Sequence, residues 1–121
     1  MEFVALDFET ASFRRGSACE IGLIHFRNGR EIDRFTTLIK PHETERFSPR
    51  AVSIHGITPE MVSNAPTFDG IANDIFPFIG NKPVVAHNAS FDASVMAQSA
   101  LVNNVKVPTI DFYCSLSISR R

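Results

Sequence analysis

The stretch Glu2-Phe3-Val4-Ala5-Leu6-Asp7-Phe8-Glu9-Thr10, residues 2–10, decides the fold that we expect for this chain. Its apolar run predicts a strand buried on both faces, which is the usual state of a central strand in a covered sheet. The end of the run carries two carboxylates, Asp7 and Glu9. Because successive side chains of a strand alternate between faces, these two acids share one face and Phe8 points into the packing on the other.

Two neighbouring carboxylates at the end of a buried strand need an explanation. They repel each other and lose hydration, which is costly unless a positive charge lies between them. A divalent cation fits this need, because Mg²⁺ takes oxygen ligands and often uses one or two carboxylates together with substrate phosphates. The ordinary alternative is that Asp7 and Glu9 mark the exit of the strand into solvent. From the strand alone, both explanations stay open.

Length and composition indicate one globular domain, residues 1–121, with a hydrophobic share of 44%. Eleven Phe residues against one Tyr and no Trp predict a core filled mainly by phenylalanine. The formal net charge is −1, so no strong overall field draws the protein to nucleic acid or to a membrane. Any contact with nucleic acid must therefore be local, and we expect it to be metal-assisted.

The two cysteines, Cys19 and Cys114, lie far apart in apolar surroundings and lack C-x-x-C spacing. We expect both to be buried free thiols in a reducing compartment. The sequence shows no signal peptide and no run of about 18 apolar residues. We therefore expect a soluble, cytoplasmic protein with no membrane partner.

The first half of the chain predicts an antiparallel meander of three strands, at residues 2–10, 18–27 and 30–40. Asn28-Gly29 joins the second strand to the third and is the strongest short hairpin signal, since both central residues of a type I′ turn need positive φ. The charged segment 41–49 shows no periodicity, so we expect a loop there.

The second half of the chain predicts helices alternating with strands. Thr58 is expected to be the N-cap and Pro59 the first residue of a short helix that ends near Asn64. The further elements that we expect are a helix from about Thr67 to Ile79, a strand at 84–86, a helix from about Ser90 to Asn104, a strand at 109–114 and the start of another helix at 118–121.

This order of elements predicts an α/β fold with a mixed five-stranded sheet, three antiparallel strands followed by parallel ones, and flanking helices. A right-handed crossover places the strand 84–86 beside the first strand and parallel to it. Ligands of such sheets collect at the carboxyl ends of strands. Asp92, in the first turn of its helix, is therefore expected near Asp7 and Glu9, which outlines a metal site.

At this point the residues resemble a known family. Three ordered segments carry the resemblance, namely Asp7-Phe8-Glu9-Thr10, Ile54-His55-Gly56-Ile57-Thr58 and His87-Asn88-Ala89-Ser90-Phe91-Asp92. They are similar to three signatures of the DEDD-type 3′–5′ exonucleases, which have the ribonuclease H-like fold. The form of the signatures is closest to the group of the proofreading epsilon subunit of bacterial DNA polymerase III, and the similarity spans nearly the whole chain.

The resemblance implies roles for seven residues. Asp7, Glu9 and Asp92 would be the catalytic carboxylates and would bind two divalent metal ions, Mg²⁺ or Mn²⁺. The residues that would contact the terminal nucleotide of the substrate are Thr10, His55, Asn88 and Phe91. The implied reaction is hydrolysis of phosphodiester bonds at the 3′ end of a single-stranded nucleic acid, DNA in preference to RNA. A DNA polymerase is the further partner that the resemblance suggests.

Several of these residues have ordinary structural explanations as well. Phe91 lies on the apolar stripe of its predicted helix and could belong to the core. His55 could bond the backbone of its turn, and Asn88 could be a turn residue or a helix cap. Asp92 near a helix N-terminus is favourable without any metal. Its expected meeting with Asp7 and Glu9 is what favours the catalytic interpretation.

The sequence also departs from the family pattern, which includes a further His-x-x-x-x-Asp motif. The last histidine here is His87, whose side chain we expect to point towards the covered face of the sheet. The only acid after Asp92 is Asp111, expected at the wrong end of the last strand. Our interpretation is the N-terminal portion of an exonuclease domain, weakly active or inactive by itself. The alternative is a non-catalytic module with a degenerate exonuclease fold that binds nucleic acid or a polymerase.

Overall fold

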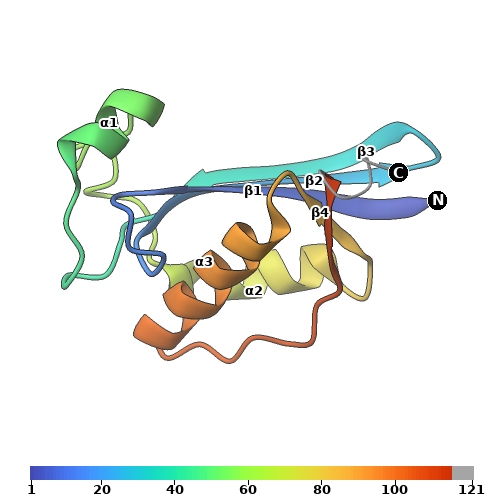
Figure 1. The fold of residues 1–121 in the computed structure, drawn as a ribbon. Helices are drawn as coiled ribbons and strands as arrows, with labels where there is room; N and C mark the ends of the chain where they lie inside the picture. Colours follow the sequence, from blue (N-terminus) through green and yellow to red (C-terminus); the bar gives the residue numbers. More distant parts are fainter. Residues whose placement is uncertain (116–121) are drawn as a thin grey trace.

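The computed structural model describes residues 1–115 and contains one mixed sheet with two long helices packed on one of its faces (Figure 1). The strands are β1 (Glu2–Thr10), β2 (Ala18–Arg27), β3 (Arg30–Leu38), β4 (Val84–Ala86) and β5 (Phe112–Cys114). The helices are α1 (Pro49–His55), α2 (Phe68–Ile79) and α3 (Ala89–Val102). The strand order is β3-β2-β1-β4-β5, so β1 is the central strand. This architecture confirms the predicted mixed five-stranded α/β sheet.

The antiparallel half of the sheet follows from the hairpin signal. β1 pairs with β2 and β2 pairs with β3 in antiparallel fashion. The turn between β2 and β3 has Asn28 at φ 52° and Gly29 at φ 80°, the two positive φ values that a type I′ turn needs. The predicted meander is confirmed, with β3 ending at Leu38 rather than at residue 40.

The parallel half of the sheet brings distant residues together. β4 pairs with β1 in parallel, with Val4 opposite Val84 and Ala5 opposite Val85. β5 continues the sheet in parallel beyond β4. Because the carboxyl ends of parallel strands meet at one edge, the end of β1 and the start of α3 lie next to each other (Figure 1). The predicted crossover is confirmed.

The core lies between the sheet and the helices α2 and α3. Val4, Leu6 and Phe8 of β1 are buried and belong to one cluster with residues of both helices. The residues of α2 that enter this cluster are spaced three or four apart along one helix face, as its period requires: Phe68, Ile71, Ile75 and Ile79.

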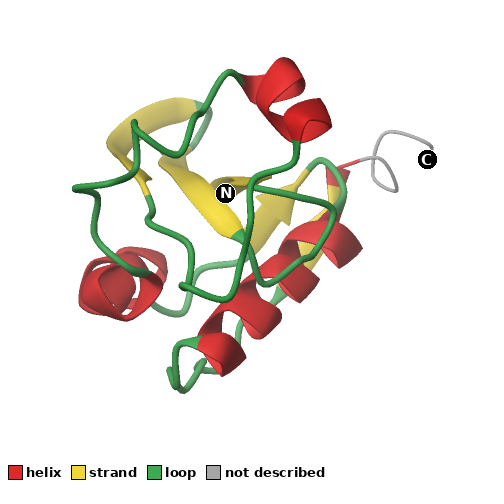
Figure 2. Cartoon of the chain, turned by 90° about the vertical axis from the view of Figure 1, so that its left-hand side faces the viewer, coloured by secondary structure: helices red, strands yellow, loops and turns green. Residues whose placement is uncertain are grey.

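The expectation that β1 is buried on both faces is wrong, because the face opposite Val4, Leu6 and Phe8 is open. Ala5 on that face is only partly buried, and Asp7 is exposed. Helices α2 and α3 both pack on the other face, and α1, the only helix of the described residues on this side, lies near one end of the sheet (Figure 1 and Figure 2). An apolar run in a sequence shows only that a strand is central, because half-covered central strands carry the same residues.

The first helix is the main error of the sequence-based prediction. α1 occupies Pro49–His55, at the end of the segment expected to be a loop. Ser48 is its N-cap and accepts a hydrogen bond from the Ala51 N–H at 3.1 Å through its Oγ. Gly56 ends it in the left-handed conformation, with φ 73°. The sequence contains two Ser/Thr-Pro pairs that could start a helix, Ser48-Pro49 and Thr58-Pro59, and the structure uses the first.

The segment after Thr58 forms turns instead of the predicted helix. Its backbone bonds join residues three apart, as in Met61 N–H to Thr58 O at 3.1 Å and Ala65 N–H to Val62 O at 3.0 Å. The other boundaries differ little, with α3 at Ala89–Val102 and β5 shortened to Phe112–Cys114. The helix start predicted at 118–121 lies outside the described residues.

Two further expectations concern the cysteines and the membrane. Cys19 is a buried free thiol as expected, whereas Cys114 is only partly buried. None of the helices in the described part of the chain combines the length and the apolar character needed to span a bilayer.

Candidate active site

Three carboxylates gather where β1 ends and α3 begins. Asp7 and Glu9 come from β1, and Asp92 comes from the first turn of α3. Asp92 is only 4% exposed. Its Oδ1 accepts a hydrogen bond of 3.1 Å from the backbone N–H of Phe8, the residue between the two acids of β1. This bond fixes α3 against β1 and holds the third carboxylate beside the other two.

Burial raises the pKa of all three acids, and the charge of neighbouring acids adds to the rise at Glu9 and Asp92. Burial is the main reason that the pKa of Asp92 rises to about 6, and the Phe8 N–H opposes the rise while the charges of Asp7 and Glu9 add to it. Burial also raises the pKa of Glu9, with a contribution from Asp7. Partial burial likewise raises the pKa of Asp7. The nearby His87 opposes this rise. The site therefore holds three carboxylates whose charged forms are disfavoured by burial, and the nearby His87 and His55 offset this only in part.

This pKa shift predicts that the metal-free protein loses stability as the pH rises. The folded pKa of Asp92, about 6, lies above its ordinary value of 3.8, so the folded state holds the proton more tightly between these two values. Stability should fall through that window and stay low above it, by about 1–3 kcal/mol at 1.36 kcal/mol per pKa unit. Urea unfolding in the presence of a chelator, repeated between pH 4 and pH 7, measures the change.

The matched variant for this prediction is Asp92→Asn, which keeps an acceptor for the Phe8 N–H. Near pH 7 it should be more stable than the parent, and the difference should vanish near pH 4. Asp74→Asn removes a carboxylate from the exposed side of α2 and is the control. Equal stability of parent and Asp92→Asn across the range would contradict the shift.

The donor set fits divalent metal ions, although it forms no closed cage. No three His, Cys, Asp or Glu side chains within residues 1–115 are arranged tightly enough to hold a metal ion as they stand. The three acids nevertheless offer only oxygen donors, and burial raises the pKa of each, so a bound cation would favour their charged forms. Mg²⁺ commonly binds through one or two carboxylates and completes its shell with water and substrate phosphates. The arrangement is therefore compatible with such ions.

His55 is engaged with backbone groups at both ring nitrogens. Its Nδ1 accepts a hydrogen bond from the Ile57 N–H at 3.0 Å, so its Nε2 carries the proton and donates to the Thr10 carbonyl at 2.8 Å. The ring thus joins the end of α1 to the end of β1, beside Thr10. The structural explanation for His55 is confirmed, and a contact with substrate stays a prediction.

Asn88 and Phe91 lie at the start of α3. Asn88 occupies the N-cap position without capping through its side chain, and its Oδ1 accepts a bond from Ser90 Oγ at 3.1 Å. Asn88 is exposed, so its side-chain amide faces solvent near the acids. Phe91 is partly buried against the core, and the guanidinium of Arg15 lies over its ring, 5.4 Å from the centroid. Phe91 therefore combines core packing with a position next to Asp92.

Two sequence-based expectations about the surroundings have different outcomes. His87 does not point to the covered face: it is exposed, and continuing the β1–β4 register by two residues places it level with Asp7. Asp111 precedes β5, where its carbonyl accepts a bond from the Val84 N–H at 2.8 Å. It lies at the amino end of the parallel strands, as expected, and away from the three acids.

Sequence reasoning missed the turn that follows β1. Phe13 in this turn is 92% exposed, and Arg15 covers Phe91. A bulky aromatic exposed next to a carboxylate cluster is the kind of side chain on which a nucleobase can stack. The sequence contained a signal for it, because Phe13 stands between polar residues in a segment without strand or helix periodicity.

The strand order agrees with the ribonuclease H-like fold of solved structures that resemble this chain. The family model described as Exonuclease (RNase_T) matches residues 4–121. The chain therefore belongs to this exonuclease family.

Individual relatives agree with this assignment. The chain is 38% identical over 92 residues to the PolC-type DNA polymerase III of Thermotoga petrophila, covering 74% of this chain and 7% of that protein. It is 37% identical over 98 residues to the DNA polymerase III subunit epsilon of Buchnera aphidicola, covering 80% of this chain and 41% of the subunit. The chain thus spans less than half the length of either relative.

A solved structure supports the same fold. Exonuclease X in complex with 5′-overhanging duplex DNA superposes with a TM-score of 0.75 at 28% identity. The alignment covers 98% of this chain and 63% of that chain. The predicted similarity to DEDD-type exonucleases of the epsilon group is confirmed.

Proposed function

We propose that this chain carries the catalytic carboxylates of a metal-dependent 3′–5′ exonuclease acting on single-stranded nucleic acid, DNA in preference to RNA. The observation that carries the proposal is the meeting of Asp7, Glu9 and Asp92 at one edge of the sheet, with raised pKa values, in a chain of an exonuclease family. Acids that repel each other in a folded protein are typical of a site built to take a cation.

The three acids would hold two divalent ions, Mg²⁺ or Mn²⁺. When bound, two such ions can generate a hydroxide nucleophile and stabilise the attacking and leaving oxygens of an in-line displacement at phosphorus. Asp92 is the fixed member of the set, because its Oδ1 bonds the Phe8 N–H. The side chain of Asp7 is exposed, so it can change its conformation to contact the ions and a substrate phosphate.

The remaining residues would position the end of the strand. The exposed amide of Asn88 can donate to a phosphate or sugar oxygen, while Thr10 and His55 line the end of β1. Phe91 would support the terminal base, since stacking on an aromatic ring tolerates every base. None of these contacts reads base identity, which suits an enzyme that shortens strands of any sequence.

A DNA polymerase is the partner that we propose, because relatives of this chain are polymerase III polypeptides. An exonuclease associated with a polymerase acts on the 3′ end that the polymerase extends. We place this activity in the cytoplasm, where the buried thiol of Cys19 stays reduced.

The test is degradation of a single-stranded DNA oligonucleotide labelled at its 5′ end. We expect a ladder of products that shorten one nucleotide at a time while keeping the label, because removal begins at the unlabelled 3′ end. A chelator should stop the reaction, and added Mg²⁺ or Mn²⁺ should restore it, because the carboxylates alone cannot neutralise the phosphate.

A second oligonucleotide, labelled at the 3′ end, distinguishes the direction. It should release its label as a mononucleotide in the first step. A ladder of shortened products that still carry the 3′ label would contradict 3′–5′ polarity. Binding of the oligonucleotide without any metal-dependent shortening would instead favour the non-catalytic module.

A further inference from the structure

The turn between β1 and β2, residues 11–17, is fixed by its own hydrogen bonds and by α3. The Ala11 N–H donates to the Ser17 carbonyl at 2.8 Å, and the Ser12 N–H donates to Ser17 Oγ at 3.2 Å. Gly16 packs so closely on α3 that an added Cβ would lie 3.3 Å from the side chain of Val102. Ser99 Oγ reaches the carbonyl of Arg15 at 3.5 Å. The backbone of the turn is therefore held in one conformation, which fixes where its side chains begin.

The two neighbouring arginines of this turn have different surroundings. Arg14 Nε donates to Glu45 Oε1 at 3.1 Å, and the Glu45 side chain is only 1% exposed. The second oxygen of Glu45 has no hydrogen-bond partner among the described residues. A buried carboxylate that loses its only cation is strongly destabilising, so we expect Arg14 to keep this ion pair and not to bind a phosphate.

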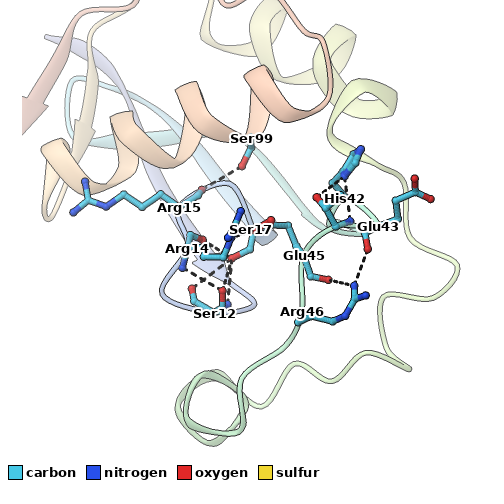
Figure 3. Close-up of polar contacts among 10 residues, drawn as sticks. Ser12, Arg14, Arg15, Ser17, His42, Glu43, Glu45, Arg46 and Ser99 are labelled. Atoms are coloured by element: carbon cyan, nitrogen blue, oxygen red, sulfur yellow. Dashed lines mark hydrogen bonds and ion pairs between the residues drawn. The ribbon is translucent and has the colours of Figure 1, made fainter.

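Arg15, in contrast, makes no ion pair with any carboxylate in the described part of the chain. Figure 3 shows its side chain extending along α3, away from Arg14 and Glu45. Its guanidinium lies over the Phe91 ring at 5.4 Å from the centroid. A guanidinium stacked on an aromatic ring keeps its N–H donors for another partner, and its fork geometry matches a phosphate.

A cavity of about 340 Å³ continues from this position along α3. Besides the turn, Ser94 and Gln98 line it from one face of α3, one helical turn apart. Arg14, Glu45 and Val102 complete its lining, so the cavity runs from Arg15 towards the C-terminal end of α3. A strand whose 3′ end lies at the acids can follow this path past Arg15, Ser94 and Gln98, while the buried Glu45 carboxylate is held by its ion pair with Arg14.

We propose that Arg15 binds a backbone phosphate of the strand upstream of the terminal nucleotide. The inference rests on the proposed function, which places the terminal nucleotide at Phe91 and the acids. The protein has a net charge of −1 and three acids at the site, so an incoming strand meets repulsion. Arg15 is the cation beside Phe91 that has no carboxylate partner in the described residues and can offset that repulsion.

The experiment compares two substrates that differ only in having an upstream phosphate. One is single-stranded oligothymidylate, and the other is the p-nitrophenyl ester of thymidine 5′-monophosphate, which carries the scissile phosphate alone. Arg15→Gln should raise KM for the oligonucleotide about tenfold and leave kcat and the ester kinetics unchanged. The slope of log KM against log salt concentration should decrease by about 0.7, as expected for one lost phosphate contact on a single strand.

Arg30→Gln is the matched control, because Arg30 is an exposed arginine in the hairpin at the opposite end of the sheet. Arg15→Lys should keep the salt dependence while losing part of the affinity. Unchanged oligonucleotide KM in Arg15→Gln would overturn the inference, and so would an equal loss on both substrates, since that indicates a structural role through Phe91. A parent protein that cleaves neither substrate would overturn the proposed function and this inference together.

Discussion

Asp7→Asn is expected to lower kcat for oligonucleotide hydrolysis by about 10³-fold or more. The reason is that a catalytic metal supplies several kcal/mol of transition-state stabilisation, and each 1.36 kcal/mol corresponds to tenfold in rate. Asp7 is the exposed acid of the set and is free to rearrange around a cation. The asparagine amide keeps the shape of the side chain but loses the charge that would hold the metal. Single-turnover rates at saturating Mg²⁺ measure the effect on the chemical step.

Asp74→Asn is the control for the loss of one negative charge, because Asp74 is an exposed acid of α2. It should leave kcat unchanged. Calorimetric titration with Mg²⁺ adds an independent readout, in which Asp7→Asn binds more weakly than the parent. If Asp7→Asn turned over at the parental rate, the carboxylates would not form the catalytic centre, whatever the chain's family.

Phe68→Ala is expected to decrease the free energy of unfolding by about 3–5 kcal/mol, the usual cost of truncating a buried phenylalanine. Phe68 is the largest of the fully buried side chains, 1% exposed, at the start of α2. It belongs to the cluster that joins α2 to Val4 and Leu6 of the central strand. Since natural domains are stable by about 5–15 kcal/mol in total, this single change should remove a large share. Urea unfolding gives the value.

Phe13→Ala provides the same chemical change on the surface. Phe13 is 92% exposed, so its truncation leaves no cavity and should change stability by less than about 0.5 kcal/mol. Similar losses for Phe68→Ala and Phe13→Ala would show that the packing between α2 and the sheet has been misjudged.

The parts of the fold that were predicted from the sequence are those with a local chemical cause. Asn28-Gly29 has the positive φ values of a type I′ turn, and the apolar spacing of α2 reproduces its buried face. The sequence-based prediction placed the first helix after Thr58 and missed α1, because the cap at Ser48 and the left-handed end at Gly56 were not considered. Burial on one side of β1 depends on which helices cover the sheet, which no strand pattern specifies.

In the candidate site, too, some features were predictable from the sequence and others were not. The spacing of Asp7 and Glu9 and the parallel crossover were sufficient to predict that Asp92 lies beside them. The stacking of Arg15 on Phe91 joins residues from separate segments with no periodic signal, so only the folded chain reveals it. His87 was misplaced because the sequence does not show which face of β4 is covered. Val84 and Ala86 are the buried residues of β4, so alternation places His87 on the open face with Asp7.

The pairing of β1 with β4 also has a consequence for how the molecule assembles. As a ribosome produces the chain, the hairpins of β1, β2 and β3 can form from adjacent segments, whereas Val4 must wait for Val84. Closing so long a loop carries an entropic cost that grows with its length, and such contacts form slowly. Two of the three acids lie on the meander, and the third comes into place only when β4 and α3 pack on β1. A chain in which β1 has not yet paired with β4 therefore lacks the complete set of carboxylates.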